Sequence, residues 1–200
     1  SEMCIRDSLG RLTTKPGFVC SKSLDYIKKA KLSNSQTIPT IEEAFNLIDG
    51  RVPILLEIKF SKHLKKNLEI FLKVLEEKLE GYNGPLALMS FSCDVIKFIR
   101  QKNFFTRFPL GLTTSFPQTE SFRDNIKNSK LENKIISNKL QFISQDWKGI
   151  ENSRIKRLKK LDIAILSWTI SSKEIEKNLE GLVDNITFEH YEPDVKKKNF

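Results

Sequence analysis

Two kinds of hydrophobic pattern alternate along this chain of 200 residues. Short continuous apolar runs are typical of buried strands, and apolar residues that recur every three or four positions are typical of amphipathic helices. Six runs predict strands at residues 53–59, 86–90, 109–113, 141–144, 163–168 and 184–188. Strands that alternate strictly with helices indicate a parallel sheet with crossover helices, either doubly wound or closed as a (β/α) barrel.

The intervening helices are predicted from their apolar stripes and from their first residues. The longest stripe predicts one helix from the spacing of Leu64, Leu68, Phe71, Leu72, Leu75 and Leu79. Two capping-box patterns mark helix starts, Thr40 with Glu43 and Ser171 with Glu174. The first opens a helix whose expected apolar face is Ala44, Phe45, Leu47 and Ile48. One further helix is expected within the polar residues 119–137.

The apolar run that begins at Arg51 ends with two charged residues, Glu57 and Lys59. Side chains on a strand alternate between its faces, so these two lie on the same face. Ligands bind at the carboxyl ends of parallel strands in α/β proteins. A carboxylate beside an ammonium at such an end indicates a divalent metal next to a phosphate. The alternative is an edge strand with a solvated Glu–Lys pair, and the spacing favours neither.

Composition narrows the class of protein. With 39% hydrophobic and 10% aromatic residues, the chain has a globular profile and is long enough for one sizeable domain. The net charge of +9 is spread along the chain, which indicates a lysine-rich bias rather than a nucleic-acid-binding surface. No apolar run approaches the roughly 18 residues of a membrane span. No glycine-rich phosphate loop follows a predicted strand, which counts against a nucleotide-binding doubly wound fold.

The folded domain is predicted to span residues 9–193, with both ends of the chain outside it. Residues 1–8 have no periodicity, and Met3 to Ser8 look like translated sequencing-adapter read-through rather than native sequence. Residues 194–200 form a basic tail. The chain is therefore expected to begin inside a longer gene.

Several segments, in the order in which they occur, resemble the glycerophosphodiester phosphodiesterase family. They are Leu9-x-Arg11-x-Thr13 and residues 37–43, 52–59, 89–91, 167–169 and 184–187. The resemblance covers about residues 9–193 and implies a TIM-type (β/α) barrel of eight strands. The six strands predicted here would then form an incomplete barrel that lacks the first two. Its first and last strands, 53–59 and 184–188, would each have an unpaired edge.

The resemblance implies metal-dependent hydrolysis of glycerophosphodiesters to glycerol phosphate and an alcohol, within glycerophospholipid metabolism. In the family, three carboxylates hold Ca²⁺ or Mg²⁺ and two histidines act as general acid and base. Glu57 matches the third metal carboxylate, Lys59 matches the phosphate-facing lysine, and Trp168 matches an aromatic residue that lines the glycerol or alcohol pocket. A core tryptophan is the alternative for Trp168.

The same resemblance implies that the site is incomplete in this chain. The family's catalytic histidines and its other two metal carboxylates have no counterpart, and the position of its His-Asp pair falls at Ile5-Arg6. His63 and His190 match no motif position and are expected to be surface residues. We therefore expect no catalytic residue here, no phosphodiesterase activity from this chain alone, and a cytoplasmic location for the protein.

Other functions stay open on the residues alone. One is a different phosphate-binding barrel, such as a phosphoinositide phospholipase-like enzyme or a phosphosugar isomerase. Another is a non-catalytic barrel that binds anions through its basic charge. A nucleic-acid binder is disfavoured, because the aromatic residues mostly fall on apolar stripes. The expected partner is a small glycerophosphodiester, with no nucleic acid and no transmembrane segment.

Overall fold

The computed structural model describes residues 8–60 and 66–193. Within these residues the chain divides into two compact units. The first comprises the chain up to Pro53 together with the segment that ends at Pro85, and the second comprises Ile54–Phe60 and the chain from Leu86 onward. The basic tail, His63, Leu64 and all but the last of residues 1–8 lie outside the described residues, so the predictions made for them stay predictions.

The first unit is helical. It contains α1 (Leu24–Lys28), α2 (Ile41–Ile48) and α4 (Leu68–Glu80), with short 3₁₀ turns at Leu9–Arg11 and Val19–Ser21. The capping box predicted for α2 is confirmed, because Thr40 Oγ1 accepts from the Glu43 amide at 3.2 Å and Glu43 Oε2 accepts from the Thr40 amide at 2.8 Å. In α4 the leucines of the predicted stripe are buried: Leu68, Leu72, Leu75 and Leu79.

Two residues that were predicted to lie on apolar faces of this unit lie elsewhere. Leu47 is 74% exposed, because it projects from the side of α2 opposite the buried Phe45. Phe71 is also exposed, on the edge of the α4 stripe. Apolar residues that fall near a helical stripe need not pack, since a helix turns by about 100° per residue and its buried face is narrow.

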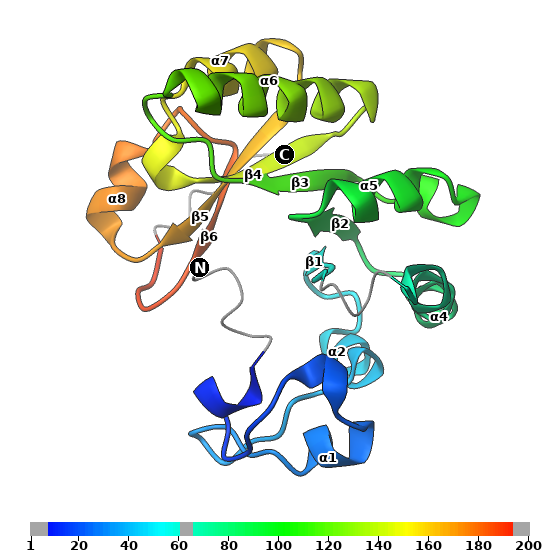
Figure 1. The fold of residues 1–200 in the computed structure, drawn as a ribbon. Coiled ribbons are helices and arrows are strands. Elements are labelled where there is room, and N and C mark those ends of the chain that lie inside the picture. The colour runs from blue at the N-terminus through cyan, green and yellow to red at the C-terminus, as the bar shows by residue number, and fades with distance from the viewer. Residues whose placement is uncertain (1–7, 61–65, 194–200) are drawn as a thin grey trace. The chain divides into compact units, whose positions relative to one another are not determined.

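The second unit is an open six-stranded sheet of parallel strands, in the order β1-β2-β3-β4-β5-β6 (Figure 1). The strands are β1 (Ile54–Glu57), β2 (Leu86–Ser90), β3 (Leu110–Thr114), β4 (Phe142–Asp146), β5 (Ala164–Ile170) and β6 (Asn185–Phe188). All six predicted strands are confirmed to within a few residues. Over the described residues β1 pairs only with β2 and β6 only with β5, so the expected gap between the first and last strands is confirmed there.

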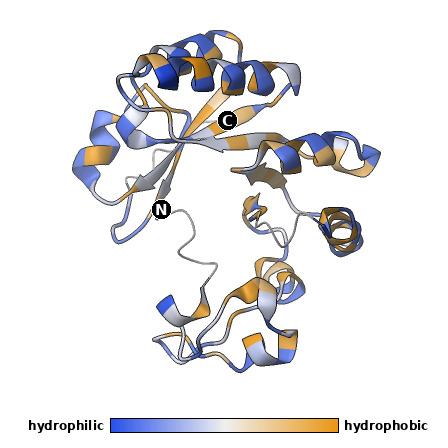
Figure 2. Ribbon diagram, viewed as in Figure 1, coloured by the Kyte–Doolittle hydropathy of each residue, from blue (hydrophilic) through white to orange (hydrophobic). Residues whose placement is uncertain are grey.

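Among the described residues of this unit there are four α-helices: α5 (Cys93–Arg100), α6 (Phe122–Ser137), α7 (Ser153–Lys160) and α8 (Lys173–Asn178). The single helix expected within residues 119–137 is therefore α6. Helices α5 and α6 carry both hydrophobic and hydrophilic residues (Figure 2), as expected for helices with one packed face. The predicted capping box of α8 is wrong by one residue, because Ser172 rather than Ser171 accepts from a first-turn amide, that of Ile175 at 3.3 Å.

The parallel register assigns the strand residues to two faces. One face carries aliphatic side chains that are almost fully buried: Leu88, Leu110, Leu112, Ile143 and Ile165. The other, called the inner face below, carries Glu57, Met89, Thr113, Ser144 and Trp168. In this register Glu57 pairs with Met89 and Thr113 pairs with Ser144, while Trp168 lies two residues beyond Leu166, the β5 partner of Ser144.

The sheet curves toward its inner face. Phe91 directly follows β2 and Trp168 lies in β5, three strands away in the sheet order. Three strand spacings in a flat sheet amount to about 14 Å. The two ring centroids are nevertheless only 5.6 Å apart, in an edge-to-face arrangement. The second unit is therefore a half-barrel whose concave surface is the inner face.

Gly111 of β3 provides a test of packing on the inner face. A Cβ atom built on Gly111 would overlap the ring of Phe142, its partner in β4. We expect Gly111→Ala to lower the free energy of unfolding by about 1–3 kcal/mol, because the ring must leave its position. Urea denaturation measures this change. Gly81→Ala is the control, since Gly81 has an ordinary φ of −85° and open space around it. Equal stability of Gly111→Ala and the wild type would contradict the position of the ring.

A buried ion-pair network joins α6 to α7, which lie side by side (Figure 1). The side chain of Arg154 is 4% exposed. Its Nε donates to Glu120 at 2.9 Å, its Nη1 donates to Glu132 at 2.6 Å, and its Nη2 donates to the Asn125 carbonyl at 3.0 Å. The hydrogen bonds from Arg154 lower the pKa of Glu120 from 4.5 to about 2. Arg157 also donates to Glu132, from a half-exposed position.

We expect Arg154→Met to lower the free energy of unfolding at pH 7 by about 3–5 kcal/mol, because Glu120 is left as a buried charge without its guanidinium partner and Glu132 loses one of its two arginines. Arg157→Met should lower the free energy of unfolding by no more than about 1 kcal/mol, since Arg157 is half-exposed and Arg154 still pairs with Glu132.

The pH dependence checks the same network. The folded-state pKa of Glu120 is depressed, so its contribution to stability is present above about pH 4.5 and is lost as the pH falls toward 2. The difference in the free energy of unfolding between the wild type and Arg154→Met should therefore become smaller as the pH falls. A difference that is the same at pH 7 and pH 3 would contradict this account.

Candidate functional site

The carboxyl end of β1 places Glu57 and Lys59 side by side on the inner face. Ile58 between them is 3% exposed, and its amide donates to the Met89 carbonyl at 2.8 Å. The hydroxyl of Ser90 donates to the Ile58 carbonyl, also at 2.8 Å. Because Ile58 is fixed on both sides of its backbone, the two charged side chains must project to the opposite face. The sequence prediction that they share a face is confirmed.

Glu57 and Lys59 form a partly buried ion pair. The Lys59 Nζ lies 2.6 Å from Glu57 Oε1, and the two side chains are 39% and 19% exposed, respectively. The Oε1 atom is itself buried, and the ammonium does not meet it with hydrogen-bond geometry. The carboxylate oxygen therefore has a compensating charge beside it but no directed hydrogen bond.

An aromatic pair extends this site across the inner face. The Lys59 ammonium lies 5.5 Å from the ring centroid of Phe91, a cation–π contact. The Phe91 ring packs edge-to-face on Trp168. The Trp168 indole N–H donates to the Ser144 carbonyl at 2.8 Å, which fixes the ring against β4. The structure thus brings the three predicted site residues into one continuous group.

Phe91 is the member of this group that the sequence prediction missed. It lay within a segment that carried the family resemblance, but no role was assigned to it. The β1–β2 register could have predicted it, because Phe91 lies two residues beyond Met89, which is the β2 partner of Glu57. Trp168 is half-buried, so it is neither a fully enclosed core residue nor a free surface residue. Its predicted role in lining a ligand pocket stays a prediction.

The described residues contain no complete metal site, and the metal-ligand role of Glu57 stays a prediction. Over residues 8–60 and 66–193, no group of three or more His, Cys, Asp and Glu side chains could hold a metal ion. The buried Oε1 of Glu57 fits a single oxygen ligand for Ca²⁺ or Mg²⁺, which prefer carboxylate oxygens. Lys59 occupies the position beside that oxygen. His190 is 81% exposed with Glu189 as its neighbour at 3.8 Å, in agreement with its predicted surface position.

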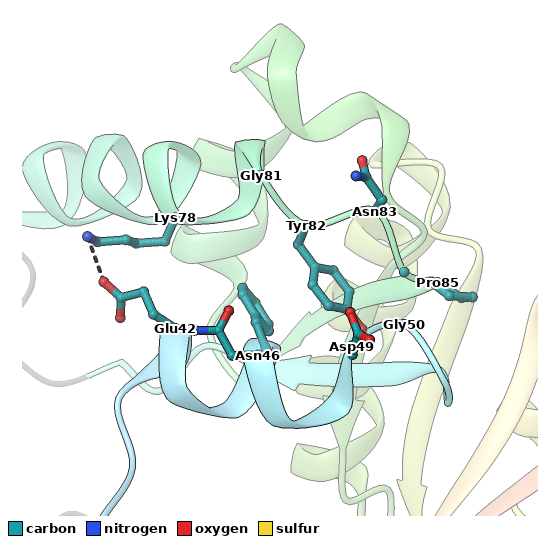
Figure 3. A pocket seen from close by; sticks show the side chains of 11 residues that line it. Glu42, Asn46, Asp49, Gly50, Lys78, Gly81, Tyr82, Asn83 and Pro85 are labelled. Atoms are coloured by element: carbon teal, nitrogen blue, oxygen red, sulfur yellow. Dashed lines mark ion pairs between the residues drawn. The ribbon is translucent and has the colours of Figure 1, made fainter.

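A pocket of about 450 Å³ lies in the first unit (Figure 3), and none of the three predicted site residues is among those that line it. It lies between α2 and the turn that follows α4. The Glu42–Lys78 ion pair, at 2.6 Å, lines one part of it. The rings of Phe45 and Tyr82, which stack with centroids 4.4 Å apart, line another. These contacts join α2 to the end of α4, so the residues that line the pocket also hold the first unit together.

Comparisons with known proteins define the fold. No protein-family model and no curated protein sequence matches the chain. Solved structures do match. A phosphodiesterase from Oleispira antarctica, in complex with the product sn-glycerol-3-phosphate, is 18% identical with a TM-score of 0.75, over 91% of this chain and 72% of that chain. A glycerophosphodiester phosphodiesterase from Thermotoga maritima is 17% identical with a TM-score of 0.63, and the match covers 91% of this chain and 72% of that chain. A glycerophosphodiester phosphodiesterase from Parabacteroides distasonis is 16% identical with a TM-score of 0.65, and the match covers 84% of this chain and 67% of that chain.

This chain therefore has the fold of the glycerophosphodiester phosphodiesterases, a TIM-type (β/α) barrel of which the described residues form six consecutive parallel strands. The resemblance seen in the sequence is confirmed at the level of the fold. At these identities the likeness does not carry over an activity. None of the helices in the described part of the chain is both long and apolar enough to cross a membrane.

Proposed function

We propose that this chain contributes the phosphate-binding side of a metal-dependent hydrolase that cleaves glycerophosphodiesters to glycerol phosphate and an alcohol. The observation that carries the proposal is the Glu57–Lys59 pair, which lies at the carboxyl end of a barrel strand beside Phe91 and Trp168. In TIM barrels this end of the strands is where active sites lie. The shared fold supports the proposal, as does the sn-glycerol-3-phosphate bound in the Oleispira antarctica structure.

Each residue has a distinct part in this proposal. Lys59 offsets the negative charge of the phosphate, as a cation does when charge builds on a transferring phosphoryl group. Glu57 is one oxygen ligand of a Ca²⁺ or Mg²⁺ ion, which would polarise the phosphoryl oxygens. The rings of Phe91 and Trp168 provide an apolar wall for the carbon chain of the alcohol. No described residue has the general acid or general base role, so we expect this chain to bind its ligand without turning it over.

A non-catalytic anion-binding barrel is the second candidate. It would use the same lysine, since one ammonium at a strand end suffices to attract a phosphate. The two candidates differ in their need for a metal. A hydrolase site should bind glycerol phosphate more tightly with Ca²⁺ or Mg²⁺ present, whereas a simple anion site should not respond to the metal.

Glu57→Gln tests the metal role, because it removes one charge at nearly constant shape. Losing a contact to a charged group costs about 1.5–3 kcal/mol, so we expect Ca²⁺ or Mg²⁺ affinity to fall by about 10- to 100-fold. Isothermal titration calorimetry measures this. Asp162→Asn is the control, since it removes the same charge from an exposed position before the amino end of β5. If Glu57→Gln and the wild type bind the metal with equal affinity, Glu57 is not a metal ligand.

Lys59→Met tests the phosphate role, because it keeps most of the stem and deletes the charge. We expect the Kd for sn-glycerol 3-phosphate to rise by about 10- to 100-fold, the equivalent of one charged contact. Lys160→Met is the matched control, with an exposed lysine at the end of α7. If both variants weaken binding equally, the basic charge of the whole chain rather than Lys59 attracts the ligand.

A further inference from the structure

Two hydroxyl groups on the inner face are buried without a hydrogen-bond partner. They belong to Thr113 of β3, which is 6% exposed, and Ser144 of β4, which is 1% exposed. The two residues are direct partners in the β3–β4 register, so their side chains lie next to each other on one face. Neither Thr113 Oγ1 nor Ser144 Oγ has a hydrogen-bond partner among the described residues.

The other buried hydroxyls of the described strands do have partners. Thr114 donates to Gln145 Oε1 at 2.8 Å, Ser90 donates to the Ile58 carbonyl at 2.8 Å, and Ser167 donates to the Gln145 carbonyl at 3.2 Å. All three lie on the sheet face opposite the inner face. Buried polar groups in folded proteins are nearly always hydrogen-bonded, and an unpaired one destabilises the fold. Two unpaired hydroxyls at adjacent positions therefore need an explanation.

The surroundings of these hydroxyls belong to the proposed site. The indole of Trp168 donates to the carbonyl of Ser144, and Trp168 in turn contacts Phe91 beside Lys59. The neighbouring inner-face residues Met89 and Leu166 are half-buried, as is Trp168. Rotation of the Met89 and Leu166 side chains would let a ligand reach the two hydroxyls, without movement of the strands or of the hydrogen-bonded Trp168 ring.

We propose that Thr113 and Ser144 form a subsite that binds the alcohol groups of a polyol phosphate. The inference rests on the proposed function and assigns the opposite end of the same ligand, whose phosphate Lys59 would hold. A hydroxyl both donates and accepts, as an alcohol group does, so the two groups match each other. Adjacent strands are about 4.8 Å apart, a spacing at which two hydroxyls can each bond one of two neighbouring alcohol groups.

The test compares two ligands that share a phosphate but differ in their alcohol groups, sn-glycerol 3-phosphate and inorganic phosphate. The variants are Thr113→Val and Ser144→Ala, each of which deletes one hydroxyl at similar shape. We expect the Kd for sn-glycerol 3-phosphate to rise about tenfold in each, the value of one hydrogen bond. The Kd for inorganic phosphate should stay unchanged. Calorimetry on the whole chain measures both.

Thermal unfolding without ligand gives a second readout. Removing an unpaired buried hydroxyl should raise the melting temperature of both variants by about 2–4 °C. Thr114→Val is the matched control, since it deletes a paired hydroxyl one residue away on the opposite face. It should lower the melting temperature and leave both affinities unchanged.

The possible failures can be told apart. If the wild-type chain binds neither ligand, the proposed function is wrong and this inference is wrong with it. If the wild type binds sn-glycerol 3-phosphate and both variants bind it equally well, only this inference is wrong. A lower melting temperature in Thr113→Val and Ser144→Ala, with unchanged affinities, would show that the hydroxyls hold internal water, and would also overturn it.

Discussion

The parallel, in-register pairing of six strands is the constraint on which the rest of this structure depends. Because side chains alternate along each strand, the register divides them into a face covered by helices and an inner face. A shift of one residue at β1 would bury Glu57 and Lys59 among aliphatic side chains, at a large desolvation cost. The apolar face thus fixes the position of the charged pair, although neither of its residues contributes to the hydrophobic core.

Much of this arrangement could be predicted from the sequence, because the relevant signals are local. Continuous apolar runs located all six strands, and the period of two placed Glu57 and Lys59 on one face. The capping box of α2 was also readable, since Thr40 and Glu43 are only three residues apart. At Ser171 the same pattern failed by one residue, because two consecutive serines offer alternative caps and only the path of the chain after β5 selects Ser172.

Contacts between distant parts of the chain could not be read in the same way. Arg154 occurs in a helix of mainly basic and polar residues, where its charge suggests an exposed position. Its burial depends on Glu120 and Glu132, which are 34 and 22 residues away in sequence. Register places Phe91 beside Lys59, but the contact between Phe91 and Trp168 forms only because the sheet curves, and curvature has no local sequence signal. The unpaired hydroxyls of Thr113 and Ser144 likewise become visible only once the partners of their neighbours are known.

In the proposed site, the ion pair between Glu57 and Lys59 would link the binding of a cation to the binding of an anion. A cation that coordinates Glu57 Oε1 must displace the Lys59 ammonium, which lies 2.6 Å from the same atom. The displaced ammonium is then available to an anion, whereas in the empty site it is neutralised by the carboxylate. Each ligand would therefore strengthen the binding of the other by an equal factor, as thermodynamic reciprocity requires. Titration of one ligand at several fixed concentrations of the other measures this heterotropic coupling, which a fixed cavity with independent subsites would not have.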